Sequence, residues 1–161
     1  GRISIDGDVR RLDARPGRIV FSTQGKSLWI TITELDPRGI GNPIRNISVV
    51  QDKYLPLHEA GVIFRPEWLD LVKDARLLRF MNWQPINGSR IAPGDLPLID
   101  APGFWKMRGQ GAPLSLMVEL ANLTGADPWF CMPHAADDAY VRAFAEYVFA
   151  KHDAALGAHV E

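Results

Sequence analysis

The sequence is poor in cysteine, in long apolar runs and in net charge, and each shortage excludes a class of protein. Cys131 is the only cysteine, so the chain can form neither an internal disulfide nor a thiolate metal cluster. No apolar run approaches the roughly 20 residues that a bilayer-spanning helix needs, so we expect no membrane partner. The net charge of -1 provides no excess of basic residues for phosphates, and we therefore expect no nucleic-acid partner.

Familiar catalytic and nucleotide-binding motifs are missing as well. No Gly-x-Gly-x-x-Gly or Walker-type loop follows a predicted strand, which argues against a nucleotide-binding fold. No Gly-x-Ser-x-Gly sequence offers the nucleophile elbow of a Ser–His–Asp hydrolase. Cys131 lies inside an apolar run, where a buried and unreactive thiol is expected. We accordingly predict no cofactor.

Residues 1–50 have the pattern of an antiparallel β domain. Alternating, β-branched or aromatic residues predict strands at 2–6, 18–22, 27–33 and 44–50, with a Pro- and Gly-rich loop at 36–43. Asp6-Gly-Asp8 is typical of a turn, and Gln24-Gly-Lys26 is typical of a hairpin connection. Because no helical pattern separates these strands, they predict part of a β-sandwich.

Helical and strand patterns alternate in the second predicted domain, residues 51–161. Helices are predicted at 66–73, at 113–124 and from Asp137 or Asp138 to about Leu156, and strands at 75–83, at 128–133 and from Gly157. Such alternation predicts an α/β fold with a parallel sheet and right-handed crossovers. An open doubly wound sheet and the first part of a (β/α)8 TIM-like barrel both fit. The missing nucleotide-binding loops favour the barrel.

Two further features of this second domain are predicted. The Gly- and Pro-rich segment 84–113, which carries Trp105, is long enough to predict a functional loop or a lid. An apolar stripe along the last helix is predicted at Val141, Phe144, Ala145, Val148 and Phe149. Both ends of the sequence lie within strand-like patterns, so we expect it to be a segment of a longer protein.

Polar and aromatic residues gather where the predicted parallel strands end, which is where α/β proteins place their sites. The candidate binding residues are Arg79, Asn82, Trp83, Trp105, His134, Asp137 and Asp138, with Glu161 on the last strand. Aromatic rings pack on the apolar faces of sugar rings, and planar polar groups bind hydroxyl groups. This combination predicts a site for a polyhydroxylated ligand.

Most of these candidates also have a purely structural interpretation. Arg79 could pair with a carboxylate, and His134 could orient a loop. Either Asp137 or Asp138 is expected to serve only as a helix N-cap. Asn82 could hold the loop backbone, and Trp83 could belong to the core. The spacing of His134, Asp137 and Asp138 fits no established ligand motif, so no metal site is predicted.

Four blocks of the sequence resemble, in order, a known family. They are Leu78-Arg-Phe-Met-Asn-Trp83, Met117-Val-Glu-Leu-Ala-Asn122, Asp127-Pro-Trp-Phe-Cys-Met-Pro-His134 and Ala136-Asp-Asp-Ala-Tyr-Val141. The family comprises secreted, mostly bacterial multidomain proteins that are often described as cellulose-binding or hypothetical. In them a β-sandwich precedes a TIM barrel similar to clan A glycoside hydrolases. The resemblance covers roughly residues 17–161.

The resemblance implies roles for three residues. Arg79 corresponds to the clan's second-strand arginine beside the nucleophile, and His134 corresponds to its third-strand histidine. Glu161 aligns with the first Glu of a Glu-x-x-Asn-Glu-x-Trp-Asn motif, which makes it the catalytic candidate of this chain. The Asn-Glu pair that resembles the clan's acid/base would follow Glu161, and the nucleophile would lie on a later strand.

Three functional hypotheses follow. The chain is a segment of a glycoside hydrolase-like enzyme acting on a polysaccharide, with activity that depends on downstream sequence. Alternatively, it is a non-catalytic carbohydrate-binding or structural module of an exported protein, or, more remotely, an intracellular α/β protein unrelated to sugars. The first two imply a secreted or periplasmic protein. Its partners would be a polysaccharide or oligosaccharide and the remainder of the barrel, in the same protein or in a second chain.

Overall fold

The chain folds into two compact units, Gly1–Ser48 and Val49–Glu161, which together make a mixed α/β protein. The computed structural model describes residues 3–36, 38–41, 43–44, 47–100 and 111–161. Among these residues, no helix is both long and apolar enough to span a bilayer.

The first unit contains a long antiparallel hairpin. Strands β1 (Ile3–Arg15) and β2 (Arg18–Ile32) are joined by a tight turn at residues 16–17, where Gly17 has a φ of 80°. The predicted turns at 6–8 and 24–26 are therefore wrong, because both segments lie inside the strands. The pairing jumps from Gly7↔Leu28 to Val9↔Thr23, so these glycine-containing segments form irregularities in the ladder.

The strand predicted at 44–50 is also wrong for the residues that the structure describes. Ile44 and residues 47–50 belong to no strand, and Ile47 and Val49 are 50% and 67% exposed. Alternating apolar and polar residues suit the two faces of a sheet, but a strand forms only when a partner strand is available to pair with it. Over its described residues, the first unit therefore has two strands instead of the predicted four, without closure into a sandwich.

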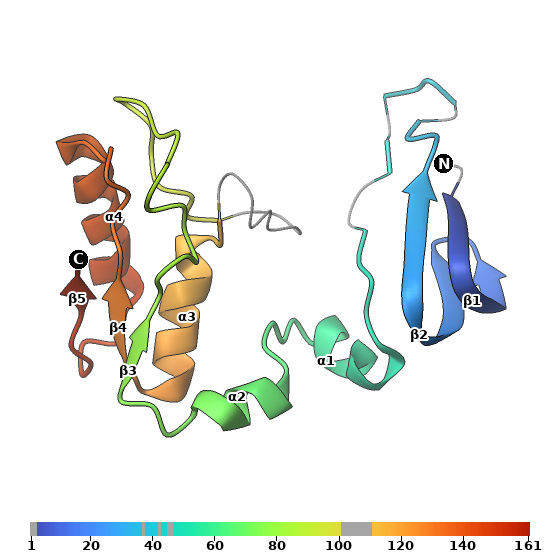
Figure 1. Cartoon of the computed structure of the whole chain (residues 1–161), viewed down its shortest axis with the longest axis horizontal. Coiled ribbons are helices and arrows are strands. Elements are labelled where there is room, and N and C mark those ends of the chain that lie inside the picture. The colour runs from blue at the N-terminus through green and yellow to red at the C-terminus, as the bar shows by residue number, and fades with distance from the viewer. Residues whose placement is uncertain (1–2, 37, 42, 45–46, 101–110) are drawn as a thin grey trace. The chain divides into compact units, whose positions relative to one another are not determined.

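The second unit follows the predicted alternation. Its elements are the 3-10 helix η1 (Asp52–Tyr54), α1 (Leu55–Glu59), α2 (Pro66–Val72), β3 (Leu77–Arg79), α3 (Leu114–Thr124), β4 (Asp127–Phe130), α4 (Asp138–Lys151) and β5 (His159–Val160). Strands β3, β4 and β5 form a parallel sheet in that order, which confirms the parallel arrangement. Figure 1 shows α3 and α4 beside this sheet. The described parts of 84–113 contain no helix or strand, as predicted for a long loop.

The ends of the two crossover helices have local causes. Gly125 ends α3 in the left-handed conformation, with a φ of 68°, as predicted. Asp137 is the N-cap of α4, and its side chain accepts a hydrogen bond from the Tyr140 amide. Helix α4 ends at Lys151 instead of near Leu156. Just beyond this end, the Asp153 amide donates to Asn122 Oδ1 on α3 at 2.9 Å, and the Asp153 side chain accepts from the Ala155 amide at 2.9 Å.

The core of the second unit lies between the sheet and the helices. Its buried members are Phe64, Phe80, Leu114, Leu116, Met117, Val118, Leu120, Phe130, Tyr140 and Phe144. The predicted stripe on α4 is partly wrong, because Ala145 is exposed and Val141 and Phe149 are 41% and 92% exposed. Phe144 and Val148 do face the core, as predicted, and Tyr140 and Tyr147 complete that face at helical spacing.

Candidate functional site

Arg79 and Glu161 form an ion pair at the C-terminal ends of the parallel strands. Arg79 is the last residue of β3, and its Nε donates a hydrogen bond to Glu161 Oε2 at 3.1 Å, with Nη2 donating to the same oxygen. Glu161 directly follows β5 and extends its ladder, since its amide donates to the Phe130 carbonyl at 2.9 Å. The pair therefore reaches across β4. The two side chains are 39% and 51% exposed, so both remain accessible to a ligand.

Two residues of β4 and its extension complete what we call the strand-end cluster: Arg79, Trp129, Cys131 and Glu161. The Arg79 guanidinium carbon lies 4.8 Å from the centre of the Trp129 ring, within range for a cation–π contact. Cys131 Sγ donates to Glu161 Oε2 at 3.6 Å. Sequence reasoning missed Trp129. It predicted Cys131 as a buried thiol, which the structure confirms, but it missed the contact of this thiol with Glu161. Strand alternation could have found both, because they flank the core residue Phe130 and so point to the opposite face.

The ion pair determines the protonation of the cluster. The hydrogen bond that Glu161 accepts from Arg79 holds the pKa of the Glu161 carboxyl group below its ordinary value. Burial raises the pKa of the Cys131 thiol, so this thiol stays protonated and can donate. Glu161 is therefore ionised at neutral pH, which suits an acceptor of hydroxyl hydrogen bonds and does not suit a general acid.

We expect the pKa of Glu161 to rise when its cationic partner is removed. In Arg79→Leu, the carboxylate should titrate at a higher pH than in the wild type, measured by NMR on the Glu161 side-chain carbonyl. The lowered pKa means that the pair contributes stability above the ordinary carboxyl pKa and loses it as the pH falls through the lowered one. An unchanged titration would show that the ion pair does not form in solution.

His134 and Asp137 lie on the neighbouring β4–α4 loop and contact the long loop. His134 Nδ1 is 2.8 Å from the Ile86 carbonyl oxygen. One carboxylate oxygen of Asp137 accepts from Tyr140 N at 2.8 Å, and the other accepts from Gly94 N at 2.9 Å. These backbone hydrogen bonds lower the pKa of Asp137. Asp138 is exposed in the first turn of α4.

The remaining predicted residues lie at the beginning of the long loop or outside the described residues. Asn82 is exposed and has a φ of 64°, a left-handed conformation that asparagine tolerates. Trp83 packs on the core, with its ring centre 5.0 Å from that of Phe80 and 6.4 Å from that of Trp68. Trp105 lies outside the described residues.

The described residues contain no group of three or more His, Cys, Asp or Glu side chains placed to hold a metal ion. His134 and Asp137 are instead engaged with backbone groups. The structure thus brings Arg79 and Glu161 together in one cluster, and His134 and Asp137 together at a second place on the same rim.

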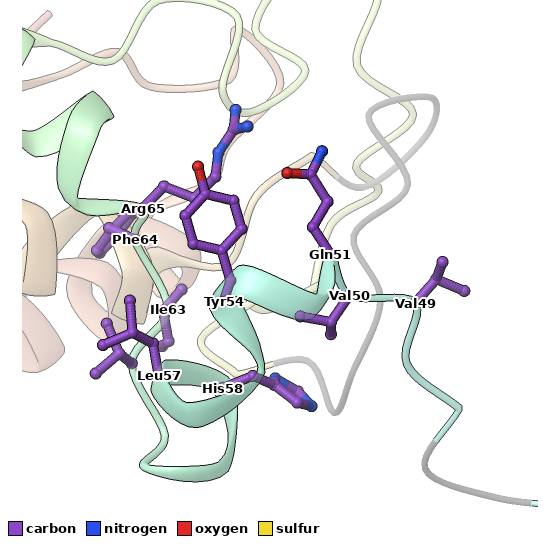
Figure 2. A pocket seen from close by; sticks show the side chains of 10 residues that line it. Val49, Val50, Gln51, Tyr54, Leu57, His58, Ile63, Phe64 and Arg65 are labelled. Atoms are coloured by element: carbon purple, nitrogen blue, oxygen red, sulfur yellow. The ribbon is translucent and has the colours of Figure 1, made fainter. Parts of the chain in front are cut away.

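A separate hollow of about 260 Å³ lies on the segment before α2. Figure 2 shows its lining, in which apolar side chains such as Leu57 and Phe64 stand beside the polar side chains of Gln51 and Arg65. Tyr54 contributes its ring, and its hydroxyl donates to Glu67 at 2.9 Å. The hollow contains none of the predicted site residues, and it is smaller than typical ligand pockets.

Comparisons with protein-family models, with curated proteins and with solved structures found no match to this chain.

Proposed function

We propose that this chain is the glycan-binding part of a glycoside hydrolase-like barrel that acts on a polysaccharide. The observation that carries the proposal is the strand-end cluster, in which Arg79 and Glu161 are paired beside Trp129 at the ends of three parallel strands. Strand ends in α/β folds are where such sites are built. The secreted or periplasmic location and the sandwich strands before the barrel belong to the same proposal.

The side chains of the cluster match the chemistry of a sugar. The guanidinium of Arg79 offers hydrogen-bond donors, and the ionised carboxylate of Glu161 offers acceptors. The Trp129 ring supplies a flat apolar surface on which a pyranose face can pack. Both members of the ion pair are partly exposed, so neither must be unburied before a ligand binds.

The sheet order is the one that part of a barrel would have. In a (β/α)8 barrel, successive strands are neighbours and their helices lie on one side. Strands β3, β4 and β5 are neighbours in chain order, and α3 and α4 share one core with them. One half of a doubly wound sheet has the same strand order, so the preference for the barrel rests on the missing nucleotide-binding loops.

The cluster by itself is suited to binding and lacks one requirement of hydrolysis. Retaining hydrolysis needs two carboxylates about 5 Å apart, one of them able to donate a proton. Glu161 is the single carboxylate of the cluster, and its pKa is lowered. We therefore expect the 161-residue chain to bind oligosaccharides without hydrolysing them. Turnover of a chromogenic glycoside by this chain would contradict the assignment.

We expect Arg79→Ala to weaken oligosaccharide binding by about 10- to 100-fold, because a hydrogen bond from a charged donor contributes about 1.5–3 kcal/mol. Isothermal titration with β-glucan, xylan and mannan oligosaccharides would measure it. Arg142→Ala is the matched control, since Arg142 is an exposed arginine on α4. Equal affinities of wild type and Arg79→Ala would remove the cluster from the site.

A non-catalytic carbohydrate-binding module is the second candidate. It is favoured by the pairing of Glu161 with Arg79, because a carboxylate held ionised is a binding group and not an acid catalyst. The two candidates differ in a longer protein in which this chain is part of a complete barrel. Hydrolysis of a bound polysaccharide would favour the enzyme, and binding without hydrolysis would favour the module.

A further inference from the structure

The first part of the long loop, residues 84–100, is a strap that lies at the rim of the proposed site. It begins five residues after Arg79, at the end of β3. Its backbone is fixed at its root, since Ala112 N donates to the Trp83 carbonyl at 2.6 Å and Gln84 is only 4% exposed. The strap therefore leaves the sheet beside the strand-end cluster. The hydrogen bond between Ala112 and Trp83 joins the two ends of the long loop, and we call this junction the closed base of the strap.

The far end of the strap caps a helix. Leu114 N and Ser115 N, in the first turn of α3, donate to the carbonyls of Leu98 and Ile99 at 2.8 and 3.0 Å. The N-cap of α3, Pro113, provides no side-chain acceptor. The strap carbonyls thus satisfy amides that would otherwise lack a partner.

Between these ends, the strap is attached to the β4–α4 loop by two side chains. The Ile86 carbonyl can only accept, so His134 Nδ1 carries the proton of the 2.8 Å hydrogen bond between them. The His134 amide also donates to this carbonyl, at 3.3 Å. Further along, the Asp137 carboxylate accepts from Gly94 N with the oxygen that does not cap α4.

We infer that His134 and Asp137 are positioning residues that hold the strap against the β4–α4 loop and thereby fix the shape of the proposed glycan site. We call their two hydrogen bonds to the strap the latch. The two hydrogen bonds join the loops that follow two adjacent strands, β3 and β4, so each loop restrains the other. Both side chains are occupied by backbone groups of the strap. They act on a ligand through the strap and not by touching it, and this part of the inference rests on the proposed function.

Substitutions can separate the latch from the stability of the helix. Asp137→Ser keeps an oxygen that caps α4 but has no second oxygen for Gly94. His134→Ala removes the Nδ1 donor, whereas His134→Asn restores a donor at the position of Nδ1. Asp138→Ala is the control, since Asp138 is an exposed carboxylate beside the latch.

Hydrogen–deuterium exchange of the full chain tests the latch. We expect exchange in 84–100 to accelerate about tenfold in His134→Ala and Asp137→Ser, to return towards wild type in His134→Asn, and to stay unchanged in Asp138→Ala. The Tyr140 amide should keep its protection in Asp137→Ser. Unchanged strap exchange in both latch variants, or equal exchange in His134→Ala and His134→Asn, would overturn the inference.

The same variants connect the latch to the glycan. Titration with the β-glucan, xylan and mannan oligosaccharides should give a higher Kd for His134→Ala than for His134→Asn. Equal values would overturn the role of the latch in shaping the site. A wild-type chain that binds no member of the panel would contradict the proposed function, and the exchange result would still decide whether the latch exists.

Discussion

Replacing Phe130 with alanine is expected to lower the free energy of unfolding of the second unit by about 3–5 kcal/mol. Phe130 is 1% exposed in the centre of the core, stacked on Phe80 at 5.7 Å and edge-to-face with Phe144 at 5.2 Å. Truncation removes both aromatic contacts and leaves a cavity between the sheet and α4. Because whole domains are stable by only about 5–15 kcal/mol, this loss is a large fraction of the stability of the unit.

Urea denaturation followed by the helical circular dichroism signal measures this effect, since the described helices all lie in Val49–Glu161. The matched control is Phe149→Ala, a phenylalanine on the same helix as Phe144 that is 92% exposed. It should change stability by no more than about 0.5 kcal/mol. Equal losses for the two substitutions would contradict the orientation of α4.

Gly111→Ala is expected to destabilise the chain by about 3 kcal/mol, through backbone strain and a steric clash. Gly111 has a φ of 75°, a conformation that disfavours an L side chain. A Cβ atom at this position would overlap the Trp83 carbonyl oxygen and lie 2.7 Å from Gln84 Cα. Backbone atoms cannot move aside as a flexible side chain can, so the closed base of the strap would open.

Gly88→Ala separates these two causes. Gly88 has a similar φ of 68°, but a Cβ atom added there would have no neighbour within 4 Å. Only backbone strain should therefore act, and it should lower the stability by about 1 kcal/mol. Both variants can be compared by the same urea denaturation. If Gly111→Ala cost no more than Gly88→Ala, the close approach of Gly111 to the Trp83–Gln84 backbone would be wrong.

Sequence patterns predicted the second unit well because its signals are local and agree with one another. Pro66 at the start of α2, Gly125 at the end of α3 and Asp137 at the start of α4 each act within one turn. The hairpin was harder, because the two glycine-containing segments predicted as turns, 6–8 and 24–26, lie inside its strands, and the turn at Gly17 was not predicted. The register between β1 and β2 places the turn at Gly17, and a register depends on two strands together, so no single segment of the sequence predicts it.

The site was predictable only where side chains stand at strand ends. Arg79 and Glu161 are separated by 82 residues, and the parallel register of β3, β4 and β5 is what brings them together. His134 was predicted as a residue that could orient a loop, but its partner is a backbone carbonyl, which carries no sequence signature. Trp129 was overlooked because its neighbours are apolar, and only alternation distinguishes its face from that of Phe130.

The most direct test of the central claim is an NMR titration of the whole chain with the oligosaccharide panel. The claim predicts saturable shifts of the Trp129 indole N–H and the Arg79 Nε–H, which lie together in the strand-end cluster. The amide of Tyr54, beside the separate hollow, should not move. Saturable shifts at Tyr54 with none at Trp129 and Arg79, or no saturable shift with any oligosaccharide, would contradict it.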